Sequence, residues 1–164
     1  MTRKSILQPI DIHRKLERMA LEMLERTEGE LIIGGIESTG FHLAEIITRH
    51  LETYAGKTFR AYRVKIDKSN PLMSMPQTDV PVELFDGATL ILVDDVQNSG
   101  KTMMYTIRHF LQYPVKSVQT CVLVDRRHNS FPVRSDYIGL SLSTTLEDHV
   151  VVEMSDKGLE ACLV

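Results

Sequence analysis

Short apolar runs alternate along this chain with segments whose apolar residues recur at helical spacing. The clearest run is residues 90–93. Residues 31–33 are also apolar throughout, and residues 118–124 are apolar except for Gln119 and Thr120. Runs that are apolar at every position predict strands covered on both faces. The order strand, helix, strand, loop, strand, helix, strand therefore predicts an α/β fold with a central parallel sheet flanked by helices. Such sheets bind ligands at the carboxyl ends of their strands.

Three helices are expected between these runs. The first starts at Asp11, which is placed to cap it, and continues to about Glu28. The second follows a turn at residues 34–40 and ends before Gly56. The inward-facing residues of the three helices are expected to be Ile12, Leu16, Met19, Met23, Leu43, Ala44, Ile47, Leu51, Ile107, Phe110 and Leu111.

The remaining segments are less regular. Residues 59–66 alternate loosely and predict a further strand. Residues 67–81 contain three prolines among polar residues, which indicates an exposed loop. Residues 131–152 predict short strands without a strong helix, and the apolar end at residues 159–164 either completes the core or packs at an interface.

Length and composition indicate a single domain spanning residues 1–164. The chain has 164 residues, 43% of them hydrophobic, and a formal net charge of −3, which does not favour binding to nucleic acid by net charge alone. No signal peptide is recognisable, and no apolar run reaches the about 18 residues of a membrane helix. The two cysteines, Cys121 and Cys162, lie far apart without a disulfide spacing. We therefore expect a cytoplasmic protein that does not bind membranes.

Residues 91–102, Ile-Leu-Val-Asp-Asp-Val-Gln-Asn-Ser-Gly-Lys-Thr, carry the most specific chemistry. Two adjacent carboxylates end a buried strand, and adjacent carboxylates can accept hydrogen bonds from the two vicinal hydroxyls of a ribose. A turn containing Gly100 then opens a helix, whose first backbone N–H groups can hold a phosphate. The segment is not a P-loop, because the first glycine of that motif would fall at Asp95. A solvated strand end followed by a simple helix cap is the alternative, but the complete string favours a site for a phosphorylated sugar.

This string resembles the phosphoribosyl diphosphate (PRPP) motif of type I phosphoribosyltransferases. Further segments resemble one branch, the PyrR family of pyrimidine-operon attenuators that are also uracil phosphoribosyltransferases. These segments are residues 18–26, 35–40, 62–63, 123–126, 132–134 and 136–139, together with His128. The resemblance is collinear and covers nearly the whole chain.

The resemblance implies a reaction in which PRPP and a free base, uracil or another small base, give a nucleoside 5′-monophosphate and pyrophosphate. It also implies Mg²⁺ carried by PRPP, with no direct protein ligand and contact through water to Asp94 and Asp95. Residues 67–81 would be a flexible loop that closes over the reacting centre. A small hood from the C-terminal and N-terminal parts of the chain would cover the base, with hood elements at about 125–148. A homodimer or larger homo-oligomer is expected.

The resemblance also assigns roles to individual residues. Asp94 and Asp95 would hold the ribose hydroxyls, and Arg63 would lie beside the pyrophosphate, with Lys65 as a further candidate for the catalytic group. The residues implied at the 5′-phosphate are Asn98, Ser99, Gly100, Lys101 and Thr102, with Gln97 as a further substrate contact. Those implied at the pyrophosphate turn are Ile36, Ser38, Thr39 and Gly40, and those implied at the base are Arg126, Tyr137 and Ile138.

The chain departs from the family pattern at three positions. Thr39 stands where the pyrophosphate turn usually has an arginine, and Glu37 adds a negative charge beside it. Either Lys65 or Lys68 then supplies a positive charge, or both are solvated strand-end charges. Position 98, acidic in purine-specific relatives and aromatic in the PyrR type, is an asparagine, which counts against a purine substrate but leaves that alternative open.

A second alternative is a nucleotide-sensing regulator that binds RNA with weak or no catalysis. RNA-binding members of the family present a basic surface on the first helix and the hood, but here Glu17 and Leu21 occupy that helix face. The basic residues that remain are Arg14, Lys15, Arg18, Arg126, Arg127, His128 and Arg134. We interpret them mainly as ordinary surface and active-site charges. The other histidines show no metal-ligand spacing.

Overall fold

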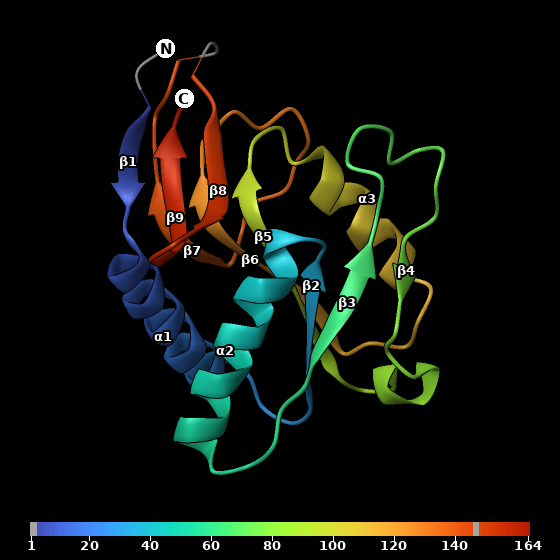
Figure 1. Cartoon of the computed structure of the whole chain (residues 1–164). Coiled ribbons are helices and arrows are strands. Elements are labelled where there is room, and N and C mark those ends of the chain that lie inside the picture. Colours follow the sequence, from blue (N-terminus) through green and yellow to red (C-terminus); the bar gives the residue numbers. More distant parts are fainter. Residues whose placement is uncertain (1–2, 146–147) are drawn as a thin grey trace.

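The computed structural model describes residues 3–145 and 148–164, which form two sheets and three α-helices (Figure 1). The larger sheet has the strand order β4-β3-β2-β5-β6-β7. Its strands are β2 (Leu31–Ile36), β3 (Ala61–Lys65), β4 (Gln77–Thr78), β5 (Thr89–Gln97), β6 (Ser117–Asp125) and β7 (Tyr137–Ser141). The helices are α1 (Pro9–Arg26), α2 (Thr39–Ala55) and α3 (Lys101–Phe110), with a 3₁₀ turn, η1, at Val82–Phe85.

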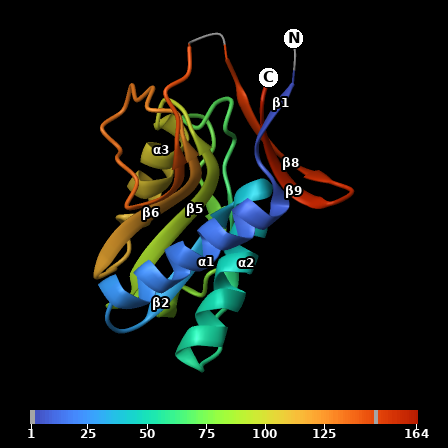
Figure 2. The ribbon, with the colours of Figure 1, turned by 90° about the vertical axis from the view of Figure 1, so that its left-hand side faces the viewer.

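All strands of the larger sheet are parallel except β4, which pairs antiparallel with β3. Helices α1 and α2 cover one face and α3 covers the other, an arrangement that Figure 2 shows from the side. In β5, Ile91 and Val93 pack toward α1 and α2, whereas Leu90 and Leu92 pack toward α3. Both faces of this strand are buried, which explains its uninterrupted apolar sequence and confirms the expected α/β fold.

A small antiparallel sheet joins the two ends of the chain. It consists of β1 (Lys4–Leu7), β9 (Gly158–Leu163) and β8 (Val150–Ser155), in that order. The hood was expected at about residues 125–148, of which 146–147 lie outside the described residues. Residues 137–141 of that segment form β7 of the larger sheet, and the small sheet joins the N-terminal and C-terminal ends, as expected for a hood built from both ends of the chain. The apolar C-terminal end becomes β9, with Leu159, Ala161 and Cys162 buried.

Several element boundaries differ from the expected ones. Helix α1 starts at Pro9, and Asp11 lies at its third position, where its carboxylate accepts a hydrogen bond from the Gln8 backbone N–H at 3.1 Å. Strand β2 continues through two glycines, so the turn before α2 is confined to residues 37–38. Leu111 was expected to face inward but is 63% exposed, because it follows the last turn of α3.

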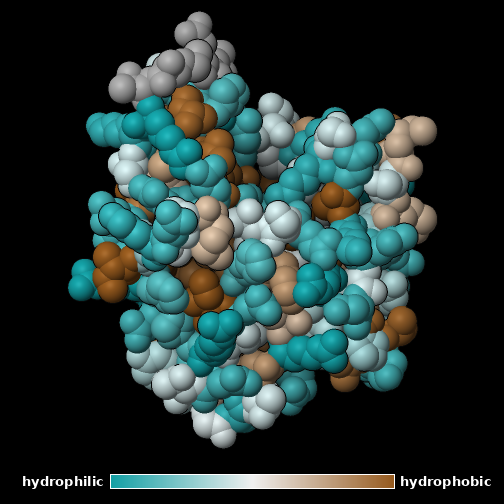
Figure 3. Space-filling view, viewed as in Figure 1, coloured by the Kyte–Doolittle hydropathy of each residue, from teal (hydrophilic) through white to brown (hydrophobic). Residues whose placement is uncertain are grey.

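The surface in Figure 3 is mainly polar, with apolar side chains scattered among the polar ones. Within the part of the chain that the structure describes, no helix is both long enough and apolar enough to cross a bilayer.

Candidate functional site

The candidate site lies at the carboxyl ends of β2, β3 and β5. Strand β2 leads through residues 37–38 into α2, and β5 leads through residues 98–100 into α3, so the first turns of both helices lie at this edge (Figure 1). The first N–H groups of a helix lack partners within the helix and carry the positive end of its dipole. The edge is therefore suited to a ligand with two anionic groups.

Two carboxylates occupy the centre of this edge. Asp94 is buried, with a relative exposure of 5%, and its Oδ1 accepts hydrogen bonds from the Asp95 backbone N–H at 2.9 Å and from Lys68 Nζ at 2.7 Å. Lys68 Nζ also lies 3.5 Å from Asp95 Oδ1. Lys68 thus comes from the proline-rich loop and neutralises part of the charge of the acidic pair. Of the two lysines considered from the sequence, Lys68 is the one at this pair.

The environment of the pair shifts two pKa values. Burial, reinforced by the negative charge of Asp95, raises the pKa of Asp94 to about 7 although Lys68 acts in the opposite direction. For Lys68, burial alone lowers the pKa, but the charges of Asp94 and Asp95 outweigh it and the net pKa is raised. Asp94 is therefore a carboxylate whose charge depends on its partners.

The turn after β5 forms a small hollow of about 80 Å³. Gly100 has a φ of 80°, a left-handed conformation that favours glycine, and the Lys101 backbone N–H donates to Ser99 Oγ at 3.2 Å. The hollow is lined by Asp94, Val96, Gln97, Asn98, Ser99, Gly100, Lys101, Thr102, Met103 and Val122. The structure thus brings the residues predicted for the 5′-phosphate together beside the acidic pair.

Gln97 has a different role from the predicted substrate contact. It borders the hollow, but its side-chain amide is buried and donates to the carbonyl of Val133 at 3.1 Å and to Asn129 Oδ1 at 3.3 Å. Its carbonyl oxygen accepts from Ser135 Oγ at 2.9 Å. Gln97 therefore holds residues 129–135 behind the turn, and nothing in the sequence pattern marked that segment as a support.

The turn before α2 lies close to Asp94 because of a glycine. A Cβ atom on Gly40 would lie 2.6 Å from the Val93 carbonyl oxygen and 3.0 Å from Asp94 Cα. Ser38 and Thr39 open the helix at this point. Ile36 was predicted at the pyrophosphate, but its side chain is fully buried in the core on the α3 side of the sheet, so it does not reach the site.

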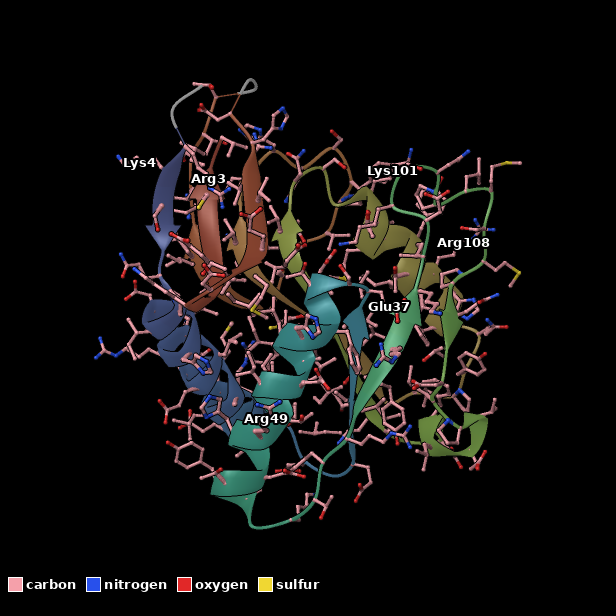
Figure 4. The ribbon with its side chains drawn as sticks, viewed as in Figure 1. Arg3, Lys4, Glu37, Arg49, Lys101 and Arg108 are labelled. Atoms are coloured by element: carbon pink, nitrogen blue, oxygen red, sulfur yellow. The ribbon has the colours of Figure 1, made fainter. Side chains whose placement is uncertain are left out.

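Glu37, in the same turn, contacts two cations of β3. Arg63 Nη1 lies 3.3 Å from Glu37 Oε1, and Lys65 Nζ lies 4.0 Å from Glu37 Oε2. Figure 4 shows Glu37 beside β3. The Arg63 guanidinium also stacks over the Phe41 ring, 4.0 Å from its centroid. The two predicted cations of the pyrophosphate region are therefore present, together with an internal carboxylate.

The residues predicted for the base are engaged within the protein. Arg126 is buried, and its guanidinium donates to Thr144 Oγ1 at 3.1 Å, to the Thr145 carbonyl at 3.2 Å and to the Asp148 carbonyl. Arg126 therefore fixes residues 144–145 and residue 148 relative to the end of β6. His128, which lies two residues further along the chain, hydrogen-bonds through Nε2 to the Thr144 carbonyl at 2.8 Å.

The prediction that Tyr137 contacts the base is wrong in this structure, whereas Ile138 lies on the same face of the sheet as the hollow and its contact with the base stays a prediction. The Tyr137 ring is fully buried on the α1 face of the sheet, and its hydroxyl donates to Gln119 Oε1 at 2.8 Å. The hollow lies on the opposite face, because side chains alternate along a strand. Ile138 packs on the α3 face, and its carbonyl accepts a hydrogen bond from Arg18 at 2.8 Å.

The carboxylates of Asp94 and Asp95 supply part of the ligand set that Mg²⁺ requires. Within residues 3–145 and 148–164, no group of three or more His, Cys, Asp or Glu side chains is placed to hold a metal ion. Asp94 and Asp95 offer carboxylate oxygens, the ligand type that Mg²⁺ prefers, but two carboxylates do not complete an octahedral site. The pair fits a metal ion that is held mainly by substrate oxygens and water.

Comparisons with known proteins agree on one family. The family described as "Phosphoribosyl transferase domain" matches residues 3–157. The Bifunctional protein PyrR of Bacillus pumilus is 34% identical, with 92% of this chain and 90% of that protein aligned. The Pyrimidine operon regulatory protein of Lactococcus lactis subsp. lactis is 30% identical, with 95% and 92% aligned. A crystal structure of a hypoxanthine-guanine phosphoribosyltransferase from Bacillus anthracis superposes with a TM-score of 0.77 over 98% of both chains at 19% identity, which shows a shared fold.

Proposed function

Because this chain belongs to the PyrR family of phosphoribosyltransferases, we propose that it transfers the 5-phosphoribosyl group of PRPP to a free base, uracil in the first instance. The products are a nucleoside 5′-monophosphate and pyrophosphate. One observation carries the proposal: Asp94, the buried member of the acidic pair, lines the hollow at the start of α3. A ribose 5-phosphate needs this combination of hydroxyl acceptors and phosphate donors.

In the proposed reaction, the bond between C1′ and the pyrophosphate oxygen breaks, a bond from C1′ to a ring nitrogen of the base forms, and that nitrogen loses its proton. Positive charge develops on the ribose, where the carboxylates of Asp94 and Asp95 stabilise it. Negative charge develops on the pyrophosphate, beside Arg63 and Lys65. Bound Mg²⁺ would neutralise charge on the diphosphate. Catalysis therefore depends mainly on placement and electrostatics.

Lys68 couples the loop to substrate binding in this proposal. Its ammonium group bridges Asp94 and Asp95, so it occupies carboxylate oxygens that the ribose hydroxyls would use. PRPP would displace it, and residues 67–76, the part of the predicted loop that precedes β4, would then rearrange over the reacting centre and exclude water. The exposed apolar side chains of this loop, Leu72, Met73 and Met75, would become covered in that state.

The double variant Asp94→Asn/Asp95→Asn tests the proposal. We expect the wild-type protein to convert PRPP and uracil to UMP, and the variant to lose both turnover and PRPP binding. A panel of uracil, hypoxanthine and guanine identifies the base and separates a pyrimidine from a purine substrate; the neutral Asn98 supports a pyrimidine. Turnover and PRPP affinity that survive both substitutions would refute the assignment.

The second candidate is a nucleotide-sensing RNA-binding regulator. The name of the Lactococcus relative, a pyrimidine operon regulatory protein, favours it. Its test is binding of a pyrimidine-operon leader hairpin over a range of salt concentrations, with and without UMP. Binding that UMP strengthens would support a regulatory role, and no binding at low salt would exclude it.

We also propose a homo-oligomer in the cytoplasm, as the family resemblance implies. Cys121 and Cys162 are both buried free thiols, which is compatible with a reducing compartment. Light scattering of the purified protein measures the oligomer, and a monomer at micromolar concentration would contradict this part of the proposal.

A further inference from the structure

Glu37 is an acidic residue in a place that otherwise attracts anions. It lies directly before α2, at the same edge of the sheet as the acidic pair and the α3 hollow. Its backbone N–H donates to the Val64 carbonyl at 2.9 Å, which fixes its backbone between the ends of β2 and β3. Its side chain is 26% exposed, so its carboxylate is in contact with solvent as well as with its partners.

The carboxylate of Glu37 forms ion pairs with both cationic side chains at this part of the edge, Arg63 and Lys65. Arg63 contacts one of its oxygens at 3.3 Å, and Lys65 lies 4.0 Å from the other. With Glu37 ionised, the local charge of the three side chains is +2 − 1 = +1. A diphosphate that approaches Arg63 and Lys65 must therefore displace a negative charge already held there, and it is repelled by that charge.

Thr39 does not compensate for this arrangement, because its hydroxyl carries no charge. Other acidic groups nearby have different partners: Asp79 accepts a hydrogen bond from the Arg63 backbone N–H at 2.7 Å and pairs with Arg60 at 3.8 Å. Glu37 is thus the carboxylate that faces the Arg63 guanidinium and the Lys65 ammonium together.

We propose that Glu37 is an internal competitor of the pyrophosphate group of PRPP. In the free protein it holds Arg63 and Lys65, and PRPP binding exchanges the Glu37 carboxylate for the diphosphate. The inference rests on the proposed phosphoribosyltransferase function. It adds a specific consequence: the Glu37 charge weakens PRPP binding, and its removal strengthens binding.

The variant Glu37→Gln tests this inference, because glutamine keeps the size and one acceptor oxygen but removes the charge. We expect the KM for PRPP to fall about five-fold, equivalent to ~1 kcal/mol, which is the size of an exposed ion pair. The dissociation constant of inorganic pyrophosphate, measured by calorimetry, should fall by a similar factor, and both effects should shrink at high salt. The kcat should change less than the KM.

Glu45→Gln is the matched control. Glu45 lies on α2, its carboxylate faces His42 at 3.4 Å, and the variant removes the same charge. We expect this control to change the pyrophosphate affinity by less than about 1.5-fold, in line with screening between exposed charges. If both variants raised the pyrophosphate affinity equally, the effect of Glu37→Gln would come from the net charge of the protein alone, and the inference would be overturned.

An unchanged or weaker affinity of Glu37→Gln for pyrophosphate would also overturn it, since Glu37 would then position Arg63 rather than compete for it. This outcome is separable from failure of the proposed function. If the wild-type protein turns over PRPP but the variant binds it no better, only the inference fails. If the wild-type protein neither turns over nor binds PRPP, the proposed function fails, and the pyrophosphate measurement still decides the role of Glu37.

Discussion

Asp94 brings a carboxylate into a largely water-excluded position, and its ionised form is costly there. The pKa of this group is raised from the ordinary 3.8 to about 7, mainly by burial. Between these two pH values the folded protein binds more protons than the unfolded chain. The contribution of Asp94 to stability is therefore fully present below about pH 4 and is lost as the pH rises through 7.

Asp94→Asn should consequently stabilise the free protein at alkaline pH. We expect the free energy of unfolding at pH 8 to rise by on the order of 1 kcal/mol, because the amide is neutral and Lys68 can still pair with Asp95. The gain should disappear toward pH 5, where Asp94 is already protonated in the wild-type protein. Urea unfolding at pH 5, 7 and 8 measures it, with the exposed Asp86→Asn as control. A variant that is less stable at pH 8 would show that the Lys68 contact outweighs the cost of burial.

At the scale of elements, the sequence predicted most reliably what is buried on both faces. Residues 90–93 are apolar at every position, and residues 118–124 at all but Gln119 and Thr120, because helices cover both sides of these strands. The periodicity of α1 and α2 is equally clear because each has one buried face. The acidic pair and the turn that follows it were identifiable for a related reason: two charges directly after a buried strand stand out against their surroundings.

Other features depend on contacts between distant segments, which no local pattern contains. The four residues of β1 are a strand only because they pair with β9 at the other end of the chain. The side chains of Gln97 and Arg126 look available in the sequence, but Gln97 is hydrogen-bonded to residues 129–135 and Arg126 to residues 144, 145 and 148. Tyr137 was misplaced because the strand register decides which face of the sheet it joins.

The junction of α2 with β5 offers a test at this scale. The alanine Cβ of a Gly40→Ala variant would lie 2.6 Å from a backbone oxygen of β5 and 3.0 Å from Asp94 Cα, so the helix must move away from the acidic pair. We expect a loss of roughly 1–3 kcal/mol in unfolding free energy, as for other overpacked sites, and a raised KM for PRPP. Chemical denaturation and steady-state kinetics measure the two effects.

Gly34→Ala is the matched control for this variant. At Gly34 an added Cβ meets only side chains, with Val64 Cγ2 nearest at 3.2 Å, and these atoms can shift. We expect a smaller loss of stability and an unchanged KM. A Gly40→Ala protein with wild-type KM would show that close contact between α2 and β5 does not position the site.

In the molecule as a whole, α1 connects the small terminal sheet to the edge of the larger one. Strand β7 is that edge, and two basic side chains of α1 donate to its carbonyl groups: Lys15 to Gly139 at 2.9 Å and Arg18 to Ile138 at 2.8 Å. Arg26 donates to the carbonyl of Asp136, the residue before β7, at 3.1 Å. Carbonyl groups of an edge strand otherwise invite pairing with another chain. These charges therefore have a structural use, which competes with their use as an RNA-binding surface.

Variants of two neighbouring residues of α1, Lys15 and Arg14, distinguish a structural role of the basic side chains from a role in RNA binding. Lys15→Met keeps the aliphatic stem but removes the hydrogen bond to β7, so we expect the free energy of unfolding to fall by ~1 kcal/mol. Arg14→Met removes the same charge from an exposed side chain and should leave stability unchanged. If the protein binds leader RNA, the slope of the logarithm of the binding constant against the logarithm of the salt concentration should fall in each variant by no more than the loss of about one phosphate contact. The opposite result would be a Lys15→Met protein that has wild-type stability but no longer binds leader RNA, while the Arg14→Met protein still binds it. That result would assign Lys15 to RNA recognition and make regulation the primary function.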